Sequence, residues 1–289
     1  MSVSTSRKIR SLMSEQNLKT RKRFGQNYLI DDKILKKIVS TSQIDSKTLV
    51  IEIGPGLGSL TQYLVESAAH VLAYEIDESL VEVLQDMFAQ NDNFTLISDD
   101  VLKRDMDADV QAHYGEAEKI IVVANLPYYI TTPFIMKSLE ESRKVDRYVL
   151  MLQLEVAKRL TASKNTKDYN ALSVIMQYLT TPSFQFTVPN TVFIPRPKVD
   201  SAVITLDVKK SKYTLPETPE LLKFVKACFK QRRKTLINNL HEAYGIDKET
   251  LKKFLHEQGF THQIRAEAIA ADELIKLGND FLENDQCST

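Results

Sequence analysis

The chain has 289 residues, 43% hydrophobic and 26% charged, which is the composition of a folded globular protein rather than of a disordered one. Its longest apolar runs are only as long as strands, and no signal-peptide core stands at the N-terminus. The two cysteines, Cys228 and Cys287, lack metal-ligand spacing. We therefore expect a cytoplasmic protein without a membrane anchor, a disulfide framework or a metal site.

The net charge is zero, but the charges are unevenly distributed along the chain. Residues 1–37 and 196–253 each carry a net charge of +7, whereas residues 38–195 and 254–289 carry −9 and −5. Two separate basic blocks can form a patch that attracts phosphates even on a neutral protein. A solvated surface with uneven charge is the alternative interpretation.

From residue 31 onward, the hydrophobic pattern predicts helices and strands in alternation. The expected helices lie at 31–44, 58–68, 78–90, 132–142 and 155–163, and the expected strands at 48–54, 70–76, 94–100, 119–125 and 146–154. A helical stretch after Tyr169 then leads to strands at 184–188 and 201–208, which we expect to close the sheet as a hairpin-like edge. Such alternation implies βαβ units and a doubly wound α/β fold with a parallel sheet.

The pattern changes after Lys209. Residues 209–220 are rich in lysine and proline, and the short helices expected beyond them lie at 219–232, 233–244, 247–258, 265–270 and 271–283. Within this region, Gly245 is a helix C-cap signal and Asp247 stands just before a helical run. We therefore expect a basic N-terminal arm at 1–25, an α/β domain at 26–208, a linker at 209–220 and an all-helical domain at 221–289.

The stretch VIEIGPGLGSL (Val50–Leu60) ends a strand after Glu52 and leads into a helix through a loop that contains Gly54 and Gly56. Glycines at the carboxyl edge of a sheet let a ligand approach the backbone, and Glu75, which closes the next strand, can accept hydrogen bonds from ribose hydroxyls. The spacing is GxGxG rather than the GxGxxG of dinucleotide enzymes. It resembles the S-adenosylmethionine loop of class I methyltransferases, although a tight structural turn is the alternative.

The third expected strand ends in Asp99 and Asp100. A carboxylate at this edge can accept a hydrogen bond from the exocyclic amine of the cofactor's adenine. A pair of surface acids before a loop is the alternative.

The fourth expected strand ends in NLPYYIT (residues 125–131), where NLPY matches the [Asn/Asp/Ser]-x-Pro-[aromatic] signature of methyltransferases acting on planar nitrogens. An adenine amino group is a poor nucleophile because its lone pair is delocalised. Two acceptors aimed at its N–H bonds favour a pyramidal nitrogen that can attack a methyl sulfonium. The side-chain oxygen of Asn125 and the carbonyl of Leu126 are the candidate acceptors.

The remaining residues of this stretch have other expected roles. Pro127 fixes the loop and removes a competing donor, and Tyr128 offers a face to a base taken out of its stack. No general base is required, since the alkylated nitrogen is acidic. We interpret Tyr129 as packing. An ordinary turn is the alternative for the whole stretch.

Two further stretches extend the pattern. RKRFGQNYLID (residues 21–32) places Gln26 and Asn27 before the first helix, and TVFIPRPKVDSAV (residues 191–203) places Phe193 on a proline-bounded loop. Phe193 can stack on the face of the base opposite Tyr128. Taken singly, Asn27 can equally be a helix cap and Phe193 a core aromatic residue.

Together these residues resemble one family, the ribosomal RNA adenine dimethyltransferases of the KsgA type. FGQNYL, EIGPGLGSLT, NLPYYITTP, FIPRPKVDSAV and FKQRRKTLINNL occur in the family's order, and the resemblance runs from Arg21 to about residue 274. It implies a class I methyltransferase (Rossmann-like) sheet and S-adenosylmethionine as cofactor. It also implies N6,N6-dimethylation of two adjacent adenosines in a hairpin near the 3′ end of small-subunit (16S) rRNA, in immature 30S subunits late in assembly.

The resemblance and the motifs together assign residues to three groups. The expected cofactor-binding residues are Asn27, Leu29, Gly54, Gly56, Glu75, Asp100 and Asn125. The expected target pocket consists of Asn125, Leu126, Pro127, Tyr128 and Phe193. The expected RNA-binding residues are Arg21, Lys22, Arg23, Arg196, Lys198, Arg232, Arg233 and Lys234. We expect a monomer.

One departure from the family pattern is Tyr169-Asn170-Ala171, where the family usually has Tyr-Gly. Asn is the next-best residue where φ is positive, so we expect the turn to survive. The related Erm enzymes methylate large-subunit rRNA and share the sheet and the catalytic loop, but the residues of the motifs match the KsgA type better. DNA adenine methylation and ribosome binding without methylation remain open as alternatives.

Overall fold

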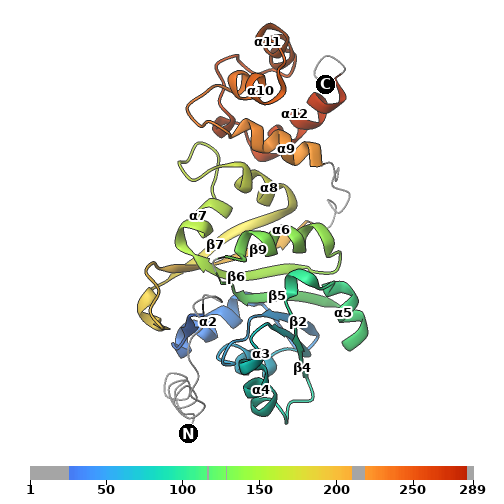
Figure 1. Cartoon of the computed structure of the whole chain (residues 1–289), viewed down its shortest axis with the longest axis vertical. Coiled ribbons are helices and arrows are strands. Elements are labelled where there is room, and N and C mark those ends of the chain that lie inside the picture. The colour runs from blue at the N-terminus through green and yellow to red at the C-terminus, as the bar shows by residue number, and fades with distance from the viewer. Residues whose placement is uncertain (1–25, 116, 128, 210–218, 285–289) are drawn as a thin grey trace. The chain divides into compact units, whose positions relative to one another are not determined.

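The structure is a computed structural model that describes residues 26–115, 117–127, 129–209 and 219–284 (Figure 1). Its strands are β1 (Tyr28–Leu29), β2 (Thr48–Ile53), β3 (His70–Glu75), β4 (Phe94–Ser98), β5 (Lys119–Asn125), β6 (Arg147–Gln153), β7 (Thr180–Val188), β8 (Phe193–Ile194) and β9 (Ser201–Val208). Its α-helices are α2 (Asp32–Ser42), α3 (Thr61–Val65), α4 (Glu78–Met87), α5 (Met106–His113), α6 (Thr131–Glu141), α7 (Leu154–Leu160), α8 (Ala171–Leu179), α9 (Pro219–Cys228), α10 (Leu236–Tyr244), α11 (Lys248–Glu257) and α12 (Ala271–Glu283). Short 3-10 helices are η2 (Val101–Lys103), η3 (Asn190–Val192) and η5 (Ala266–Ala268).

Seven of the strands form one sheet in the order β4-β3-β2-β5-β6-β9-β7, while β1 pairs with β8 separately. The pairs β3–β4, β2–β3, β2–β5 and β5–β6 are parallel, and β9 runs antiparallel to β6. The doubly wound α/β sheet expected from the sequence is confirmed, with β9 and β7 at its edge. The strand order reverses between β2 and β5, and ligands of such sheets bind outside the carboxyl ends of the strands at that point.

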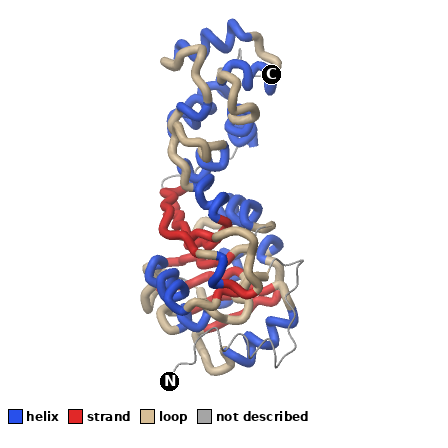
Figure 2. Tube along the Cα trace, turned by 90° about the vertical axis from the view of Figure 1, so that its left-hand side faces the viewer, coloured by secondary structure: helices blue, strands red, loops and turns tan. Residues whose placement is uncertain are grey.

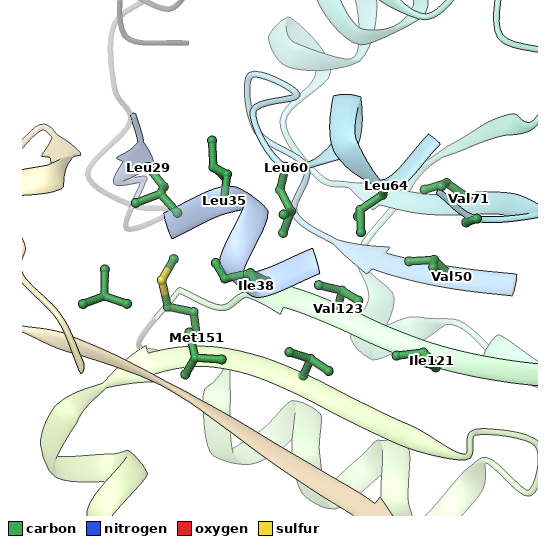
Figure 3. Close-up of a cluster of buried hydrophobic side chains, with 14 of the residues drawn as sticks. Leu29, Leu35, Ile38, Val50, Leu60, Leu64, Val71, Ile121, Val123 and Met151 are labelled. Atoms are coloured by element: carbon green, nitrogen blue, oxygen red, sulfur yellow. The ribbon is translucent and has the colours of Figure 1, made fainter. Parts of the chain in front are cut away.

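The central strands are buried on both faces because helices lie on both sides of the sheet (Figure 2). On one face, Ile38 of α2 belongs to the same apolar cluster as Val123 of β5 and Met151 of β6 (Figure 3). On the other face, the hydroxyl groups of Tyr148 in β6 and Ser138 in α6 lie 2.6 Å apart and share a hydrogen bond. This burial on two sides explains why the strands appear in the sequence as continuous hydrophobic runs.

Carboxylate N-caps fix where two helices beside the sheet begin. Asp31 accepts a hydrogen bond from the N–H of Ile34 at 3.0 Å and starts α2, as the sequence predicted. Asp77 accepts from the N–H of Ser79 at 3.2 Å and starts α4 directly after β3. The second cap places the end of β3, and therefore Glu75, at the edge of the sheet.

Several short elements differ from the prediction. The strands β1 and β8 were not expected, because two-residue strands carry no periodicity. The helix α5 was also not expected, and α3 is shorter than predicted. The helix predicted at 219–232 ends at Cys228, and residues 229–235 form a turn before α10.

Asn170 does not adopt the left-handed conformation that we expected. Its backbone is extended, with φ −157° and ψ −176°, and its side chain accepts a hydrogen bond from the N–H of Leu172 at 2.8 Å. The hydroxyl of Ser173 accepts from the N–H of Asn170 at 3.1 Å, which completes a capping box at the start of α8. The expectation of positive φ was therefore wrong, and the asparagine is used for its side-chain oxygen.

Contacts divide the chain into two compact units. The first runs to Ala157 and includes Ser183–Val208, and the second comprises Lys158–Pro182 together with the chain from Lys209 onward. Residues 158–182 were expected in the α/β domain, but their helix α8 packs against α9 and α12. In the described residues, no helix is both long and apolar enough to cross a membrane.

Candidate active site

A cavity of about 210 Å³ lies at the carboxyl ends of β2, β3, β4 and β5. Its lining includes Gly54 after β2, Glu75 at the end of β3, Asp100 after β4 and Asn125 at the end of β5. These four residues come from segments far apart in the sequence, and the sheet brings them to one edge. The position is the one expected for a ligand site in a doubly wound fold.

The glycine loop leaves the backbone open to this cavity. Gly54 has φ +67°, and a Cβ built there would meet no heavy atom within 4 Å. Gly56 has φ +62°, and a Cβ there would come within 3.2 Å of the ring of Tyr28. A side chain is therefore disfavoured by conformation at both positions and by contact at the second.

Glu75 is a buried carboxylate held by backbone donors. The N–H of Gly56 donates to one of its oxygens at 3.2 Å, and the N–H of Asp77 donates to the other at 2.9 Å. Burial raises the pKa of Glu75, while these two backbone N–H groups oppose the shift. Its side chain is therefore fixed beside the glycine loop, in the lining of the cavity.

The two aspartates after β4 are divided between different partners. Asp99 forms an ion pair with Arg104 at 3.7 Å, whereas Asp100 caps η2 by accepting from the N–H of Leu102 at 3.0 Å. Both aspartates line the cavity. Asp100 accepts this hydrogen bond through Oδ1. Its Oδ2 has no donor among the described residues.

Asn125 has a defined orientation. Its side-chain nitrogen donates to the backbone carbonyl of Asn27 at 3.1 Å. This bond uses the donor side of the amide and leaves the side-chain oxygen as an acceptor in the cavity lining. The contact also shows that Asn27 acts on Asn125 through its backbone.

The unexpected pair β1–β8 brings two further predicted residues together. Leu29 is paired with Phe193 across this ladder, and the N–H of Ile30 donates to the carbonyl of Val192 at 3.0 Å. Both Leu29 and Phe193 are buried and line the cavity. Phe193 therefore belongs to the hydrophobic core and to the cavity wall at the same time.

The loop after β5 is anchored at both of its ends. The N–H of Leu126 donates to the carbonyl of Met151 at 3.1 Å, and the carbonyl of Pro127 accepts from the N–H of Ile130 at 3.2 Å. Leu126 and Pro127 both line the cavity, as predicted, whereas Tyr128 lies outside the described residues.

Tyr129 contradicts its interpretation as a packing residue. The residue is 54% exposed, and it lines the cavity. It lies on the turn that leads into α6, and its exposure shows that it is not part of the core.

The charge of the lining decides which cofactor fits. Among the described lining residues, Glu52, Glu75, Asp99 and Asp100 are acidic, and none is Lys, Arg or His. A dinucleotide would place its negatively charged pyrophosphate near these carboxylates, which would repel it. S-adenosylmethionine carries a positive sulfonium and no phosphate, so the residues present fit it.

Glu52 also lines the cavity, although the sequence marked it only as the end of a strand. It is 2% exposed and accepts a hydrogen bond from the hydroxyl of Thr61 at 2.7 Å. Burial raises its pKa to about 8, the Thr61 bond opposes the shift, and nearby Glu75 adds to it. Tyr28, beside Gly56, and Ile76, after Glu75, also line the cavity without having been predicted. Only the spatial arrangement of their strands identifies them.

Two of the predicted RNA-binding residues of the first unit lie on the loop before β9. Arg196 and Lys198 are both exposed, and the Nε of Arg196 donates to the side-chain oxygen of Asn190 at 2.9 Å. Three other predicted RNA-binding residues lie outside the described residues: Arg21, Lys22 and Arg23.

In the second unit, Arg232, Arg233 and Lys234 lie in the turn between α9 and α10, not on a helix. Arg232 donates to the carbonyl of Lys167 and lies 3.7 Å from a carboxylate oxygen of Glu267. Arg233 is exposed and has no ion-pair partner among the described residues.

The opposite ends of this turn are tied to one acid. Lys230 and Lys234 each lie 3.1 Å from a carboxylate oxygen of Glu242. Three of the cations in the turn therefore have partners within their own unit. In the part of the chain that the structure describes, no cluster of three or more His, Cys, Asp or Glu side chains is arranged to hold a metal.

A cavity that suits a nucleoside without phosphate, beside an oriented amide acceptor, is the arrangement of a methyltransferase that uses S-adenosylmethionine. The family model for ribosomal RNA adenine dimethylase matches residues 17–280. The chain belongs to that family.

Curated relatives agree with this assignment. The ribosomal RNA small subunit methyltransferase A of Lactococcus lactis subsp. lactis (strain IL1403) is 44% identical over 273 residues, which cover 94% of this chain and 93% of the relative. The protein of the same name from Staphylococcus carnosus (strain TM300) is 41% identical over 283 residues, which cover 96% of each chain.

Two solved structures share the fold. A dimethyladenosine transferase from Plasmodium falciparum matches with a TM-score of 0.74 at 24% identity, over 88% of this chain and 97% of that one. The 23S rRNA methyltransferase ErmE matches with a TM-score of 0.66 at 23% identity, over 87% of this chain and 98% of that one.

Proposed function

We propose that this chain dimethylates N6 of two adjacent adenosines in a hairpin near the 3′ end of small-subunit rRNA. Its substrate is the immature 30S subunit late in assembly, and it acts as a monomer in the cytoplasm. The name shared by the relatives from Lactococcus and Staphylococcus supports the small subunit as the target.

The observation that carries this proposal is the orientation of Asn125. Its amide nitrogen is committed to the carbonyl of Asn27 at 3.1 Å, so its oxygen is the part that can accept a hydrogen bond from a substrate amine. We assign the backbone carbonyl of Leu126 as the second acceptor. The two acceptors take the two N–H bonds of adenine N6 and favour the pyramidal nitrogen that can react.

When bound, S-adenosylmethionine supplies an electrophilic methyl group on a sulfonium. Phe193 forms an apolar wall for the target base, and Tyr128 is assigned to the opposite face from the sequence. The alkylated nitrogen loses its proton to water, so the chain needs no general base. After the first transfer one N–H remains, and a single acceptor suffices to orient it.

We assign contacts with RNA phosphates to the exposed cations in both units. Arg196 and Lys198 serve the first unit, and Arg233 serves the second, with Arg232 and Lys234 shaping the turn around it. Electrostatic attraction of this kind does not depend on sequence and weakens with salt. The cavity therefore determines the specificity for adenosine, and the exposed cations contribute affinity for the ribosomal particle.

The test is primer extension on small-subunit rRNA from a strain that lacks the gene. Dimethyladenosine stops the polymerase, so the strain should lose stops near the 3′ end and regain them with the wild-type gene. Stops that persist without the protein would exclude this target. Methyl transfer to purified immature small subunits, compared with transfer to duplex DNA, separates RNA from DNA methylation.

A further inference from the structure

Tyr129 is an exposed side chain at the cavity, and the proposed mechanism does not explain its position. It is 54% exposed although it belongs to a loop anchored at both ends, and it lines the cavity. Ile76, directly after β3, is 42% exposed and lines the same cavity. Two large apolar groups left partly in water at one cavity indicate a surface that a ligand covers.

The backbone holds Tyr129 in place. The carbonyl of Pro127, before Tyr129, accepts from the N–H of Ile130 at 3.2 Å and from the hydroxyl of Thr131 at 3.2 Å, both after it. The N–H of Phe134 then donates to the carbonyl of Ile130 at 2.8 Å and continues the turn into α6. A ligand that meets the ring therefore spends little free energy on ordering this loop.

The surroundings of the ring restrict the kind of ligand. Burial raises the pKa of the Tyr129 phenol, and the carboxylates of Asp100 and Glu75 raise it further. The Tyr129 phenol therefore lies within electrostatic range of both carboxylates. We expect Asp100 to bind the adenine of the cofactor and Glu75 to bind its ribose. An RNA phosphate would be repelled there, whereas an uncharged nucleoside would not.

We propose that Tyr129 is a cofactor-contact residue, whose ring covers the adenosine half of bound S-adenosylmethionine. This inference rests on the proposed use of that cofactor in the cavity. It assigns the first tyrosine of the pair to the target base and the second to the cofactor. The ring should lose most of its exposure when the cofactor or its product binds.

The test is calorimetric titration with S-adenosylhomocysteine in the absence of RNA. Stacking between an aromatic side chain and a base is worth about 1–3 kcal/mol, so Tyr129→Ala should weaken the Kd about 5- to 150-fold. Tyr129→Phe keeps the ring and should remain within about threefold of wild type. Tyr114→Ala is the matched control, because Tyr114 is 37% exposed in the same unit and is not among the described lining residues.

An unchanged Kd for Tyr129→Ala would overturn the inference. An unchanged Kd combined with weaker binding to immature small subunits would assign the ring to RNA instead. If the wild-type chain itself fails to bind S-adenosylhomocysteine, the cofactor assignment falls together with this inference. If wild type binds it but the rRNA stops persist without the gene, only the proposed target is lost.

Discussion

Gly54→Ala separates the cofactor role of the glycine loop from its conformational role. Gly54 has φ +67°, and a Cβ there would meet no heavy atom within 4 Å. Gly245, the C-cap of α10 in the helical unit, has φ +73° and is equally free of neighbours. Alanine therefore faces the same backbone strain at both positions, and only one of them lines the cavity.

The magnitudes follow from this comparison. A left-handed conformation costs a residue with a Cβ about 1–2 kcal/mol, so both variants should lose about that much stability. At Gly54 the new methyl group also points into the space that we propose for the cofactor. Forcing an extra methyl into a packed contact costs about 1–3 kcal/mol, which corresponds to a Kd about 5- to 150-fold weaker.

Two measurements check the prediction. Denaturant unfolding gives the stability of both variants, and calorimetry gives their Kd for S-adenosylhomocysteine. We expect similar stability losses and weaker binding for Gly54→Ala alone. Equal affinities in the two variants would refute the claim that the loop approaches the ligand at Gly54.

Three further predictions concern catalysis, pH and RNA. Asn125→Ala should lower kcat about 10²- to 10³-fold with particle binding retained. Asn93→Ala removes a similar amide bond, to the carbonyl of Val65, outside the described lining and should leave kcat within about threefold. Because the folded-state pKa of Glu52 is about 8, above its usual 4.5, the stability it contributes is full below pH 4.5 and is lost as pH rises through 8. The Tm of wild type, measured by thermal melts, should therefore fall relative to that of Glu52→Gln as the pH rises from 4.5 to 8. Charge removal at Arg233 should reduce the salt slope of particle binding by about one, as measured by filter binding at several salt concentrations, whereas Arg232→Gln should mainly lower Tm.

The sheet could be predicted from the sequence because its strands are recognisable as hydrophobic runs. Two-sided burial makes β2, β3, β5 and β6 continuous apolar runs, and the residue that ends each of them can be counted along the chain. Gly54, Glu75 and Asn125 were found in this way, and Asp100 after the less buried β4, since parallel strands bring their carboxyl ends to one edge.

The contacts made by short or irregular segments could not be predicted. The ladder between β1 and β8 has two residues on each side, too few for periodicity, yet it sets Leu29 beside Phe193. Tyr129 follows a proline loop, and its exposure depends on how that loop turns into α6. Position 170 shows the same limit, because asparagine suits both a left-handed turn and an extended N-cap.

The basic turn between α9 and α10 shows that a local charge count does not reveal which cations already have acidic partners. Lys230 and Lys234 share Glu242, and these bonds lower the pKa of that carboxyl. Arg232 contacts Glu267 and donates to a backbone carbonyl. These contacts stabilise the turn, and they must break before Arg232 can bind a phosphate. Each of these cations must give up an existing partner to bind RNA. The net gain in binding free energy is therefore smaller than for a cation that has no partner to lose. Arg233 has no such partner among the described residues, so the salt dependence of binding should be most sensitive to this position.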